Sequence, residues 1–287
     1  MSQMPQPIVR AGLIGAGIQL SRTPALHEHE GAAQGLRYSY RLIDLEQRGL
    51  GVAALPDLLA EAERANLVGV NITHPCKQVV IPLLDDLSDE ARALGAVNTV
   101  VLRGGRRVGH NTDWWGFAEN VRRGLPDVAL HRVALFGAGG AGAAVAHAAL
   151  ALGVAHLAIV DVEPARAQAL AVRLAEQFGR ARVLADTDAA RAVAEADGII
   201  NSTPVGMANY PGTPLPVTLL RPAMWVADIV YFPLETELLR AARALGCRTL
   251  DGGGMAVFQA VEAFRLFTGL QADADRMLRH FAQMGAP

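Results

Sequence analysis

Short apolar runs alternate along the chain with longer segments in which apolar residues recur every three or four positions. The short runs predict strands over residues 8–15, 38–45, 67–73, 96–102, 132–138, 156–161, 198–203 and 225–231. The longer segments predict helices, notably over residues 24–35, 55–65, 113–124, 140–153, 163–178, 234–245 and 254–268. Strands separated by helices of this length are typical of βαβ units, whose strands pair in parallel. The pattern therefore predicts an α/β protein with parallel sheets.

The best position for a domain joint is around residues 110–125. There a loop, "GGRRVGHNTD", leads into a predicted helix and then into "GLPDVALHR". A second unit, of the dinucleotide-binding type, starts at residue 132. A chain of 287 residues is long enough for two modest domains with a core each. We therefore expect an N-terminal α/β domain followed by a nucleotide-binding domain.

Composition and charge exclude several classes of protein. Hydrophobic residues make up 51% and charged residues 19%, and the net charge of −2 lacks the basic excess of a nucleic-acid binder. The chain has no run of about 20 apolar residues for a membrane span. The start, "MSQMPQPIVR", does not read as a secretory signal. Cys76 and Cys247 are too few for a disulfide framework. We expect a cytoplasmic protein, with neither nucleic acid nor membrane as a partner.

The segment "VALFGAGGAGAAVAHAALALG" places three glycines, Gly137, Gly139 and Gly142, in the spacing GxGxxG between a predicted strand and a predicted helix. In that context the first glycine permits the tight turn and the second lets the backbone approach a pyrophosphate. The third lets helix and strand pack closely, and the pyrophosphate lies at the positive end of the helix. The predicted cofactor-binding loop comprises Gly137, Ala138, Gly139, Gly140, Ala141 and Gly142.

The next predicted strand, "HLAIVD", ends at Asp161. A carboxylate at this position accepts hydrogen bonds from the adenosine ribose hydroxyls and repels a 2′-phosphate, which favours NAD over NADP. Arg166 complicates this prediction, because a nearby arginine can accommodate that phosphate. Alternatively, Arg166 is a solvated helix residue that pairs with Glu163.

Lysine and arginine together number 26, and Lys77, in "NITHPCK", is the only lysine. Arginine stays protonated at any usable pH, whereas a lysine ammonium can release its proton. A site that moves a proton through a cationic side chain can therefore use lysine but not arginine. The residue type makes Lys77 a candidate for proton transfer, unless it is one solvated lysine retained by chance.

Together these motifs resemble the shikimate dehydrogenase family over nearly the full length of the chain, and most closely its quinate/shikimate dehydrogenase branch. The segments that carry the resemblance are "LSRTPALH" (20–27), "NITHPCK" (71–77), "GAVNTVV" (95–101), "GHNTDWWGF" (109–117), "NSTPVGM" (201–207) and "DGGGMAVFQAVEAF" (251–264). The sequence departs from most of the family in two places, and in both it resembles the NAD-using branch. Thr23 replaces the second serine of a Ser-x-Ser motif, and "VDVEPAR" replaces a basic motif.

The resemblance implies two α/β domains with the active-site cleft between them. The first, over residues 1–112 and completed by C-terminal helices at about 255–287, would bind the substrate and carry the catalytic lysine. The second, over residues 113–254, would be the Rossmann-type domain that binds NAD. The expected partner is a small molecule, quinate or shikimate, and the expected oligomeric state is monomer or homodimer.

The resemblance also implies roles for single residues in the oxidation of a ring hydroxyl. Lys77 would accept the proton with Asp113 as its partner, although Asp113 could also be a helix N-cap. Ser21 and Thr23 would bind the substrate carboxylate, although Thr23 before Pro24 equally suits an N-cap. The ring hydroxyls would be bound by Thr73, Asn98, Gln259 and Tyr231. The nicotinamide half of the cofactor would be bound by Thr203, Val205, Met207, Val230 and Gly254.

Three other functions are consistent with parts of this pattern. One is an NADP-using shikimate or aminoshikimate dehydrogenase. Another is a sensor that binds substrate or cofactor without turnover, against which the presence of both Lys77 and Asp113 argues. A methylenetetrahydrofolate dehydrogenase would share the glycine loop and a catalytic lysine, but "GHNTDWWGF" argues against it. No HExxH or CxxC motif occurs, so no metal site is predicted.

Overall fold

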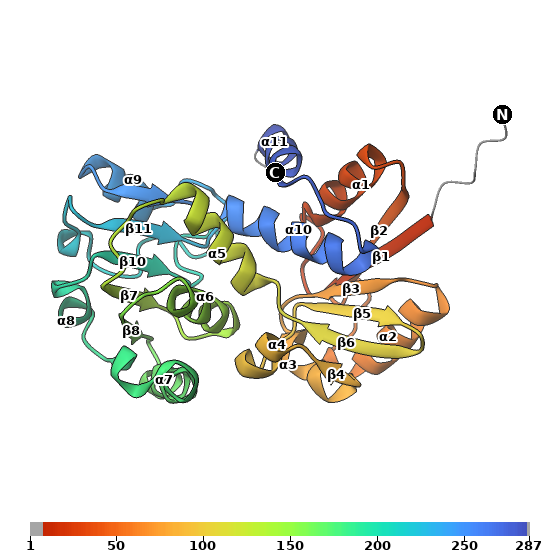
Figure 1. Ribbon diagram of the computed structural model, residues 1–287, viewed down its shortest axis with the longest axis horizontal. Coiled ribbons are helices and arrows are strands. Elements are labelled where there is room, and N and C mark those ends of the chain that lie inside the picture. The colour runs from red at the N-terminus through yellow and green to blue at the C-terminus, as the bar shows by residue number, and fades with distance from the viewer. Residues whose placement is uncertain (1–7, 286–287) are drawn as a thin grey trace. The chain divides into compact units, whose positions relative to one another are not determined.

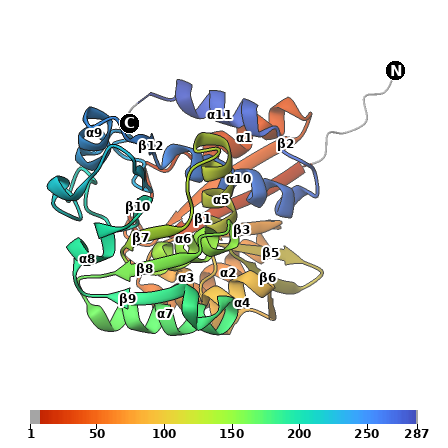
Figure 2. The same ribbon diagram turned by 60° about the vertical axis from the view of Figure 1, so that its left-hand side comes forward.

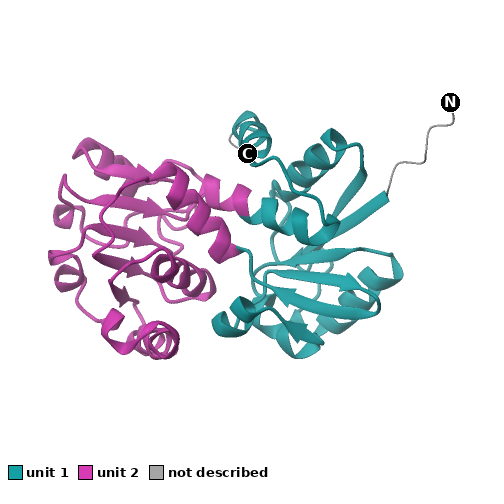
Figure 3. Cartoon of the chain, viewed as in Figure 1, with its two compact units in different colours: residues 1–112, 259–285, 287 teal, residues 113–258, 286 magenta. Residues whose placement is uncertain are grey.

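The computed structural model describes residues 8–285, which form two compact units, each with its own sheet (Figure 1). Unit 1 contains the described residues up to Thr112 together with Gln259–Gly285, and unit 2 contains Asp113–Phe258 (Figure 3). The prediction that the start of the chain is not a secretory signal concerns residues 1–10, and residues 1–7 of these lie outside the described residues. No helix of the described part is long and apolar enough to cross a membrane.

Unit 1 is built on a six-stranded mixed sheet with the strand order β2-β1-β3-β5-β6-β4. Its strands are β1 (Ile8–Gly15), β2 (Arg37–Asp44), β3 (Gly69–Ile72), β4 (Asp86–Leu87), β5 (Thr99–Arg103) and β6 (Arg106–His110). Its helices are α1 (Thr23–Ala33), α2 (Leu55–Arg64), α3 (Cys76–Val79), α4 (Asp89–Leu94) and α11 (Ala274–Gln283). The strand β1 pairs in parallel with both β2 and β3.

The prediction of parallel sheets is wrong for part of unit 1. The strand β5 runs antiparallel to both β3 and β6. Only Gly104 and Gly105 separate β5 from β6, and both have positive φ, 61° and 73°. Positive φ at both central residues is the geometry of the two-residue hairpin turn, which glycine adopts without steric cost. The stretch "GGRRVGHNTD", predicted to be a loop, is therefore the turn and second strand of a hairpin.

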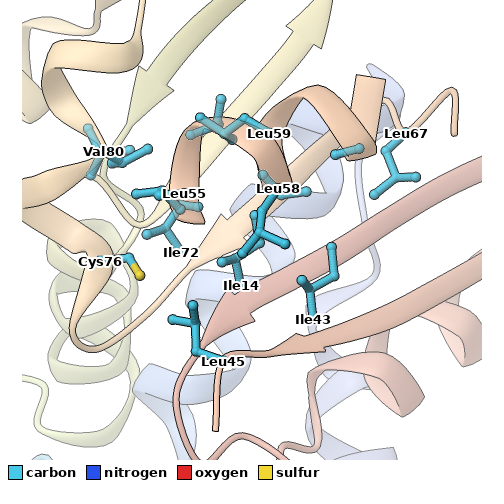
Figure 4. Close-up of a cluster of buried hydrophobic side chains, with 14 of the residues drawn as sticks. Ile14, Ile43, Leu45, Leu55, Leu58, Leu59, Leu67, Ile72, Cys76 and Val80 are labelled. Atoms are coloured by element: carbon cyan, nitrogen blue, oxygen red, sulfur yellow. The ribbon is translucent and has the colours of Figure 1, made fainter. Parts of the chain in front are cut away.

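Side chains of unit 1 alternate between two cores, one on each face of the sheet. Ile14 and Ile72 point to the face covered by α2, where they pack with Leu55 and Leu59 (Figure 4). The other face, formed in part by Ala11, Leu13 and Tyr40, packs against Ala263 and Phe267. This two-residue alternation follows from the pleat of the strands, and it fixes their register.

Unit 2 is a six-stranded sheet, parallel throughout, with the strand order β12-β11-β10-β7-β8-β9. Its strands are β7 (Arg132–Phe136), β8 (His156–Val160), β9 (Val183–Asp186), β10 (Gly198–Asn201), β11 (Trp225–Asp228) and β12 (Arg248–Leu250). Its helices are α5 (Asp113–Gly124), α6 (Gly140–Ala151), α7 (Pro164–Phe178), α8 (Ala189–Ala194) and α9 (Glu237–Ala244). The α/β prediction with a parallel sheet is confirmed here.

The strand order of unit 2 reverses direction between β10 and β7. The chain winds from β7 outward through β8 to β9, and α7 lies along the last two of these strands (Figure 2). It then returns to β10 and winds outward the other way, to β11 and β12. In open α/β sheets, ligands bind at such a reversal, outside the carboxyl ends of the strands. The long helix α10 (Gly253–Thr268) follows β12.

Candidate functional site

The carboxyl ends of β1, β2 and β3 lie at one edge of the unit 1 sheet. Gly15 ends β1 opposite Asp44, the last residue of β2. The backbone N–H of Thr73, just past the end of β3, donates to the carbonyl of Ile14 (2.9 Å). Because β5 is antiparallel to β3, its first residues reach this same edge, and so does the end of β6. The segments that contain the predicted substrate-binding residues of unit 1 follow or precede these strand ends.

Ser21 and Thr23 share a tight turn before α1. The hydroxyl of Ser21 donates to that of Thr23 (3.2 Å), and the backbone N–H of Thr23 donates back to Ser21 Oγ (3.3 Å). The prediction that Thr23 caps the helix is wrong, because α1 begins at Thr23 and the N-cap residue is Arg22. Both hydroxyls are therefore held together in the turn, half-buried, and Thr23 is the first residue of the helix.

Thr73 and Lys77 come from the segment between β3 and α3. Gly15 makes room for Thr73, since a Cβ at Gly15 would lie 2.2 Å from Thr73 Cγ2. The half-buried Lys77 belongs to the short helix α3, and its carbonyl accepts from the backbone N–H of Val97 (2.8 Å). That hydrogen bond ties the lysine segment to the start of β5. Thr73 and Lys77 thus lie on backbone that is held by neighbouring strands.

Asn98 is the centre of a buried hydrogen-bond network at the same edge. Its Oδ1 accepts from the backbone N–H of Thr112 (2.7 Å) and from the Thr99 hydroxyl (3.0 Å). Its Nδ2 donates to Thr112 Oγ1 (3.0 Å) and to Gln259 Oε1 (3.3 Å). Asn98 and Gln259, far apart in sequence, are therefore in contact. The network also fixes Thr112, which sequence reasoning missed and which immediately precedes Asp113.

Asp113 and Tyr231 belong to unit 2. Asp113 is the first residue of α5 and is buried, with 4% of its surface exposed. Tyr231 follows β11 and is 48% exposed. Asn71, which precedes Thr73 by two residues, has a structural role, since it bonds Tyr40, Thr99 and the Asn98 carbonyl.

The glycine loop of unit 2 lies between β7 and α6, at the reversal of strand order. Gly137 has φ +101°, and a Cβ on Gly142 would lie 2.2 Å from the Gly137 carbonyl oxygen. In contrast, a Cβ on Gly139 or Gly140 would meet no described atom within 4 Å. Two glycines are thus required by the fold of the loop itself, and two leave open space above its backbone. This geometry fits the close approach of a pyrophosphate.

Asp161 connects the end of β8 to the glycine loop. Its Oδ2 accepts from the backbone N–H of Ala138 (2.6 Å), and its Oδ1 accepts from that of Glu163 (2.9 Å). A carboxylate has about four acceptor positions, so two remain for ribose hydroxyls. Arg166 forms an ion pair with Glu163 (2.7 Å), as one of the two interpretations of Arg166 predicts.

The loop after β10 is organised by a buried amide. Asn201 Oδ1 accepts from the backbone N–H (3.0 Å) and the hydroxyl (2.7 Å) of Thr203, while its Nδ2 donates to the Val205 carbonyl (2.9 Å). The same Nδ2 donates to Asp228 Oδ1 (3.0 Å), which also accepts from the Val230 N–H (3.0 Å). One network thus holds three of the predicted nicotinamide-binding residues, Thr203, Val205 and Val230, in the loops after β10 and β11.

Two further predicted residues occupy different surroundings. Met207 is exposed and lies in the loop after β10. Gly254 lies in the first turn of α10, where a Cβ would come within 1.8 Å of Asn120 Oδ1, so packing alone requires glycine there.

Ser202, Asn201 and Asp228 are site-building residues that sequence reasoning missed. The hydroxyl of Ser202 donates to the carbonyls of Phe136 (2.8 Å) and Gly137 (2.9 Å) and so holds the glycine loop. The signal that could have found all three is their position, since each is a polar residue at or just after the carboxyl end of an apolar strand. Among the described residues no group of three or more His, Cys, Asp or Glu could hold a metal ion.

Unit 2 combines a parallel sheet with a glycine loop, and unit 1 gathers hydroxyl, amide and lysine groups at one edge of its sheet. Together these features define a two-unit α/β dehydrogenase. Comparison with known proteins gives the family. Residues 13–100 match the shikimate dehydrogenase substrate binding domain, and residues 252–280 match the shikimate 5′-dehydrogenase C-terminal domain. Residues 120–224 match the alanine dehydrogenase/PNT C-terminal domain. The chain belongs to the shikimate dehydrogenase family, and it is an oxidoreductase.

Similar proteins are known under two cofactor names. Shikimate dehydrogenase (NADP(+)) from Streptomyces avermitilis is 58% identical, with 98% of this chain and 97% of the relative covered. Quinate/shikimate dehydrogenase (NAD(+)) from Corynebacterium efficiens is 52% identical over 95% and 97%. The solved structure of quinate dehydrogenase from Corynebacterium glutamicum in complex with NAD superposes with a TM-score of 0.91, at 49% identity and 97% and 100% coverage. These similarities confirm the predicted family.

Proposed function

We propose that the protein catalyses the reversible NAD-dependent oxidation of the C3 ring hydroxyl of quinate or shikimate, which yields 3-dehydroquinate or 3-dehydroshikimate. The observation that carries the proposal is the edge of the unit 1 sheet. There the segment of Lys77, the only lysine of the sequence, lies at the same strand ends as the hydroxyl pair of Ser21 and Thr23 and the hydrogen-bond network of Asn98. This combination of groups suits a polyhydroxylated carboxylic acid. Relatives over 50% identical are known as quinate/shikimate dehydrogenases.

In this proposal unit 1 provides most of the residues that bind the substrate, and Tyr231 of unit 2 is added to them. Ser21 and Thr23 donate to the substrate carboxylate, and Thr73, Asn98, Gln259 and Tyr231 bind the ring hydroxyls. The Asn98 amide is oriented by Thr112 and Thr99, so its position does not depend on the ligand. Groups held in place before binding lose little further entropy when the substrate arrives, which favours a defined substrate orientation.

The proposed proton path uses Lys77 and Asp113. As the ring alcohol becomes a ketone, its hydroxyl proton passes to Lys77 Nζ, and it returns from there in the reverse reaction. Asp113 holds the reacting hydroxyl and stabilises the lysine in its protonated form. The bound dinucleotide supplies the hydride acceptor, so the protein itself has one proton to move.

Unit 2 binds NAD in this proposal, and four features of the segment after β8 favour NAD over NADP. Asp161 directly follows β8 and Glu163 comes two residues later, so this segment, proposed to face the adenosine ribose, carries two carboxylates that would repel a 2′-phosphate. Val162, which is 98% exposed, offers no side-chain donor, and Pro164 opens α7 without a backbone N–H. Arg166 is the opposing feature, but its guanidinium is paired with Glu163.

The nicotinamide half of NAD is assigned to the loops after β10 and β11 and to the start of α10. The residues proposed to contact it are Thr203, Val205, Met207, Val230 and Gly254.

Initial rates with quinate and with shikimate, each with NAD and with NADP, test the proposal. We expect turnover of at least one of the two acids, with NAD as the better cofactor. A relative 58% identical is known as an NADP(+) enzyme, so an NADP-preferring shikimate dehydrogenase is the competing result. Absence of turnover with all four combinations would overturn the activity and favour a binding protein without catalysis.

A further inference from the structure

Asp44, the last residue of β2, is a buried carboxylate that no step of the proposed reaction uses. Only 2% of its surface is exposed. It lies opposite Gly15 in the parallel pairing of β1 and β2, so its side chain reaches the segment that leaves β1. That segment leads directly to Ser21 and Thr23.

All of the acceptor capacity of Asp44 is used by this neighbourhood. Its Oδ1 accepts from the backbone N–H groups of Gly17 (3.1 Å) and Glu46 (3.0 Å). Its Oδ2 accepts from the N–H of Ile18 (3.0 Å) and from the side-chain amide of Gln19 (2.8 Å). Three of these four donors belong to consecutive residues of one loop. An ionised carboxylate offers four acceptor positions, and an asparagine side chain cannot replace it because one of its two polar atoms donates.

The loop in turn holds the hydroxyl pair. The carbonyl of Ile18 accepts from the backbone N–H of Ser21 (3.0 Å), and Ser21 Oγ is bonded to Thr23. The loop also needs Gly17, whose φ of +65° lies in the left-handed region. A series of hydrogen bonds thus runs from the Asp44 carboxylate through Ile18 to Ser21 and Thr23, while Gly17 and Gln19 fix the same loop to Asp44.

We propose that Asp44 is a positioning residue for the substrate carboxylate, acting through the loop that presents Ser21 and Thr23. The inference rests on the proposed function, since it assigns to Asp44 the geometry of that proposed subsite. Asp44 does not touch the substrate in this proposal.

The negative charge of Asp44 alone predicts the opposite change in KM for the substrate, so the test distinguishes charge from loop geometry. Asp44 carries a negative charge near a site proposed to bind an anion, so neutralising it would by itself favour a carboxylate substrate. If Asp44 acts through loop geometry, Asp44→Asn should instead raise KM for quinate or shikimate about tenfold or more, because charge-assisted hydrogen bonds are lost. KM for NAD should not change, since the loop belongs to unit 1.

Glu30→Gln provides a matched control. Glu30 is a buried carboxylate of the same unit, and it accepts from Arg276, Gln34 and the backbone N–H of Asp273. It lies in α1, well past the turn, so its substitution should lower thermal stability without raising substrate KM. Gln19→Ala is the milder variant for use if Asp44→Asn does not fold. It removes one donor from an exposed side chain and should raise KM by less than Asp44→Asn.

A double-mutant cycle separates positioning from general destabilisation. In a background of Ser21→Ala with Thr23→Ala, Asp44→Asn (or Gln19→Ala) should have little further effect on KM, because the groups it positions are absent. Unchanged or lowered KM in the single variants, or fully additive effects, would overturn the inference. Failure of the proposed function is distinguishable, because it would appear in the unmodified protein as the absence of turnover with either acid.

Discussion

Asp44 in unit 1 and Asp228 in unit 2 are buried aspartates at strand ends, and their surroundings affect ionisation differently. The side-chain hydrogen bond from Gln19 and three backbone N–H groups hold the pKa of Asp44 below its ordinary value. Burial raises the pKa of Asp228, and the hydrogen bonds from Val230, Thr236 and Asn201 only partly oppose that effect. Both side chains organise a loop at the edge where a ligand is proposed to bind. The same residue type therefore organises a loop in each unit, although its surroundings shift the pKa in opposite directions.

At the residue scale the first prediction concerns Lys77. Lys77→Arg should retain substrate and cofactor binding and lose turnover, because the charge is kept but can no longer be released. A lost general base typically costs about 10²–10⁴ in rate. The measurement is kcat, together with binding of NAD and quinate by calorimetry. A variant with the kcat of the unmodified enzyme would remove Lys77 from the proton path.

A chemical experiment checks the same residue without substitution. Since Lys77 is the only lysine, an amine-directed reagent can react only at Lys77 and at the N-terminal amine. We expect modification of Lys77 to abolish turnover, and NAD with quinate to protect it from the reagent. Mass spectrometry measures the extent of modification. Equal modification of Lys77 with and without the ligands would contradict its placement beside the substrate.

At the scale of elements, the site depends on turns at the carboxyl ends of strands, and the turn before α1 can be tested directly. Ser21→Ala with Thr23→Ala should raise KM for the acid and leave KM for NAD unchanged. Hydrogen bonds to a charged group contribute about 1.5–3 kcal/mol each. Thr23→Ser is the matched control, because it keeps the hydroxyl. A falling melting temperature with unchanged KM would show that the pair serves only the fold.

Much of the fold could be predicted at this scale, and the exceptions have physical causes. Each strand of unit 2 from β7 to β11 except β9 has a strong apolar run, so the parallel unit was predictable. The β5–β6 hairpin was not, because β6 reads "RRVGH" and its residues are mostly half-exposed. The helix α11 was expected only without bounds of its own, among the C-terminal helices at about 255–287, and an ion pair between Arg276 and the buried Glu30 helps to hold it on α1.

The residues of the candidate site also divide into those that could be singled out in the sequence and those that could not. Motifs with a chemical requirement, such as the lone lysine and the glycine loop, could be singled out in the sequence. Asp44, Asn201 and Ser202 were not singled out, since their position at the end of a strand is the one signal they give and it does not show which groups they bind. Their roles follow from hydrogen bonds to backbone groups that only the folded chain brings together.

The packing of α1 carries a prediction about acid stability. His27 is fully buried among Tyr38, Tyr40, Phe264 and Phe267. Burial lowers its pKa to about 3, so the folded protein binds this proton far less readily than the unfolded chain. Stability from the neutral ring is therefore present above pH of about 6.5 and is lost as pH falls toward the folded pKa, at up to about 1.4 kcal/mol per pH unit.

The test compares the free energy of unfolding at pH 7 and pH 5 by urea titration. His27→Phe should lose less of it over this range than the unmodified protein, by about 2 kcal/mol. Tyr38→Phe is the control. It removes the partner of His27 Nδ1 (3.0 Å) but keeps the titrating ring, so it should retain the pH dependence. Equal losses in His27→Phe and the unmodified protein would contradict the argument.

At the scale of the whole molecule, most substrate-binding residues are assigned to unit 1 and the cofactor-binding residues to unit 2, and each unit has its own core. This division makes the predicted effects separable. Changes at the unit 1 edge should alter the kinetics of the acid, and changes after β8 should alter those of the dinucleotide. Both ligands are anionic, and the net charge of the chain is −2. Recognition must therefore come from local donors and not from the overall field of the protein.

The cofactor prediction belongs to this scale because relatives of similar identity are known under both cofactor names. Asp161→Asn should narrow the preference for NAD by removing one charge that repels a 2′-phosphate. Like charges a few ångströms apart near a surface cost on the order of a few kcal/mol, which corresponds to at least about tenfold in the ratio of specificity constants. NADP should not become the better cofactor, since the substitution adds no new phosphate donor.

Glu163→Gln tests whether the ion pair with Glu163 keeps Arg166 from binding a 2′-phosphate. It removes a second negative charge and also releases Arg166 from its ion pair, so the freed guanidinium can meet the phosphate. We therefore expect it to improve NADP use, and Glu163→Gln with Arg166→Ala to lose most of that gain. The measurement is kcat/KM for NAD and NADP in the unmodified enzyme, in Asp161→Asn and in these two variants. If the unmodified enzyme uses both cofactors equally well, the exposed Glu163–Arg166 pair is too weak to withhold Arg166, and Asp161 does not set the preference.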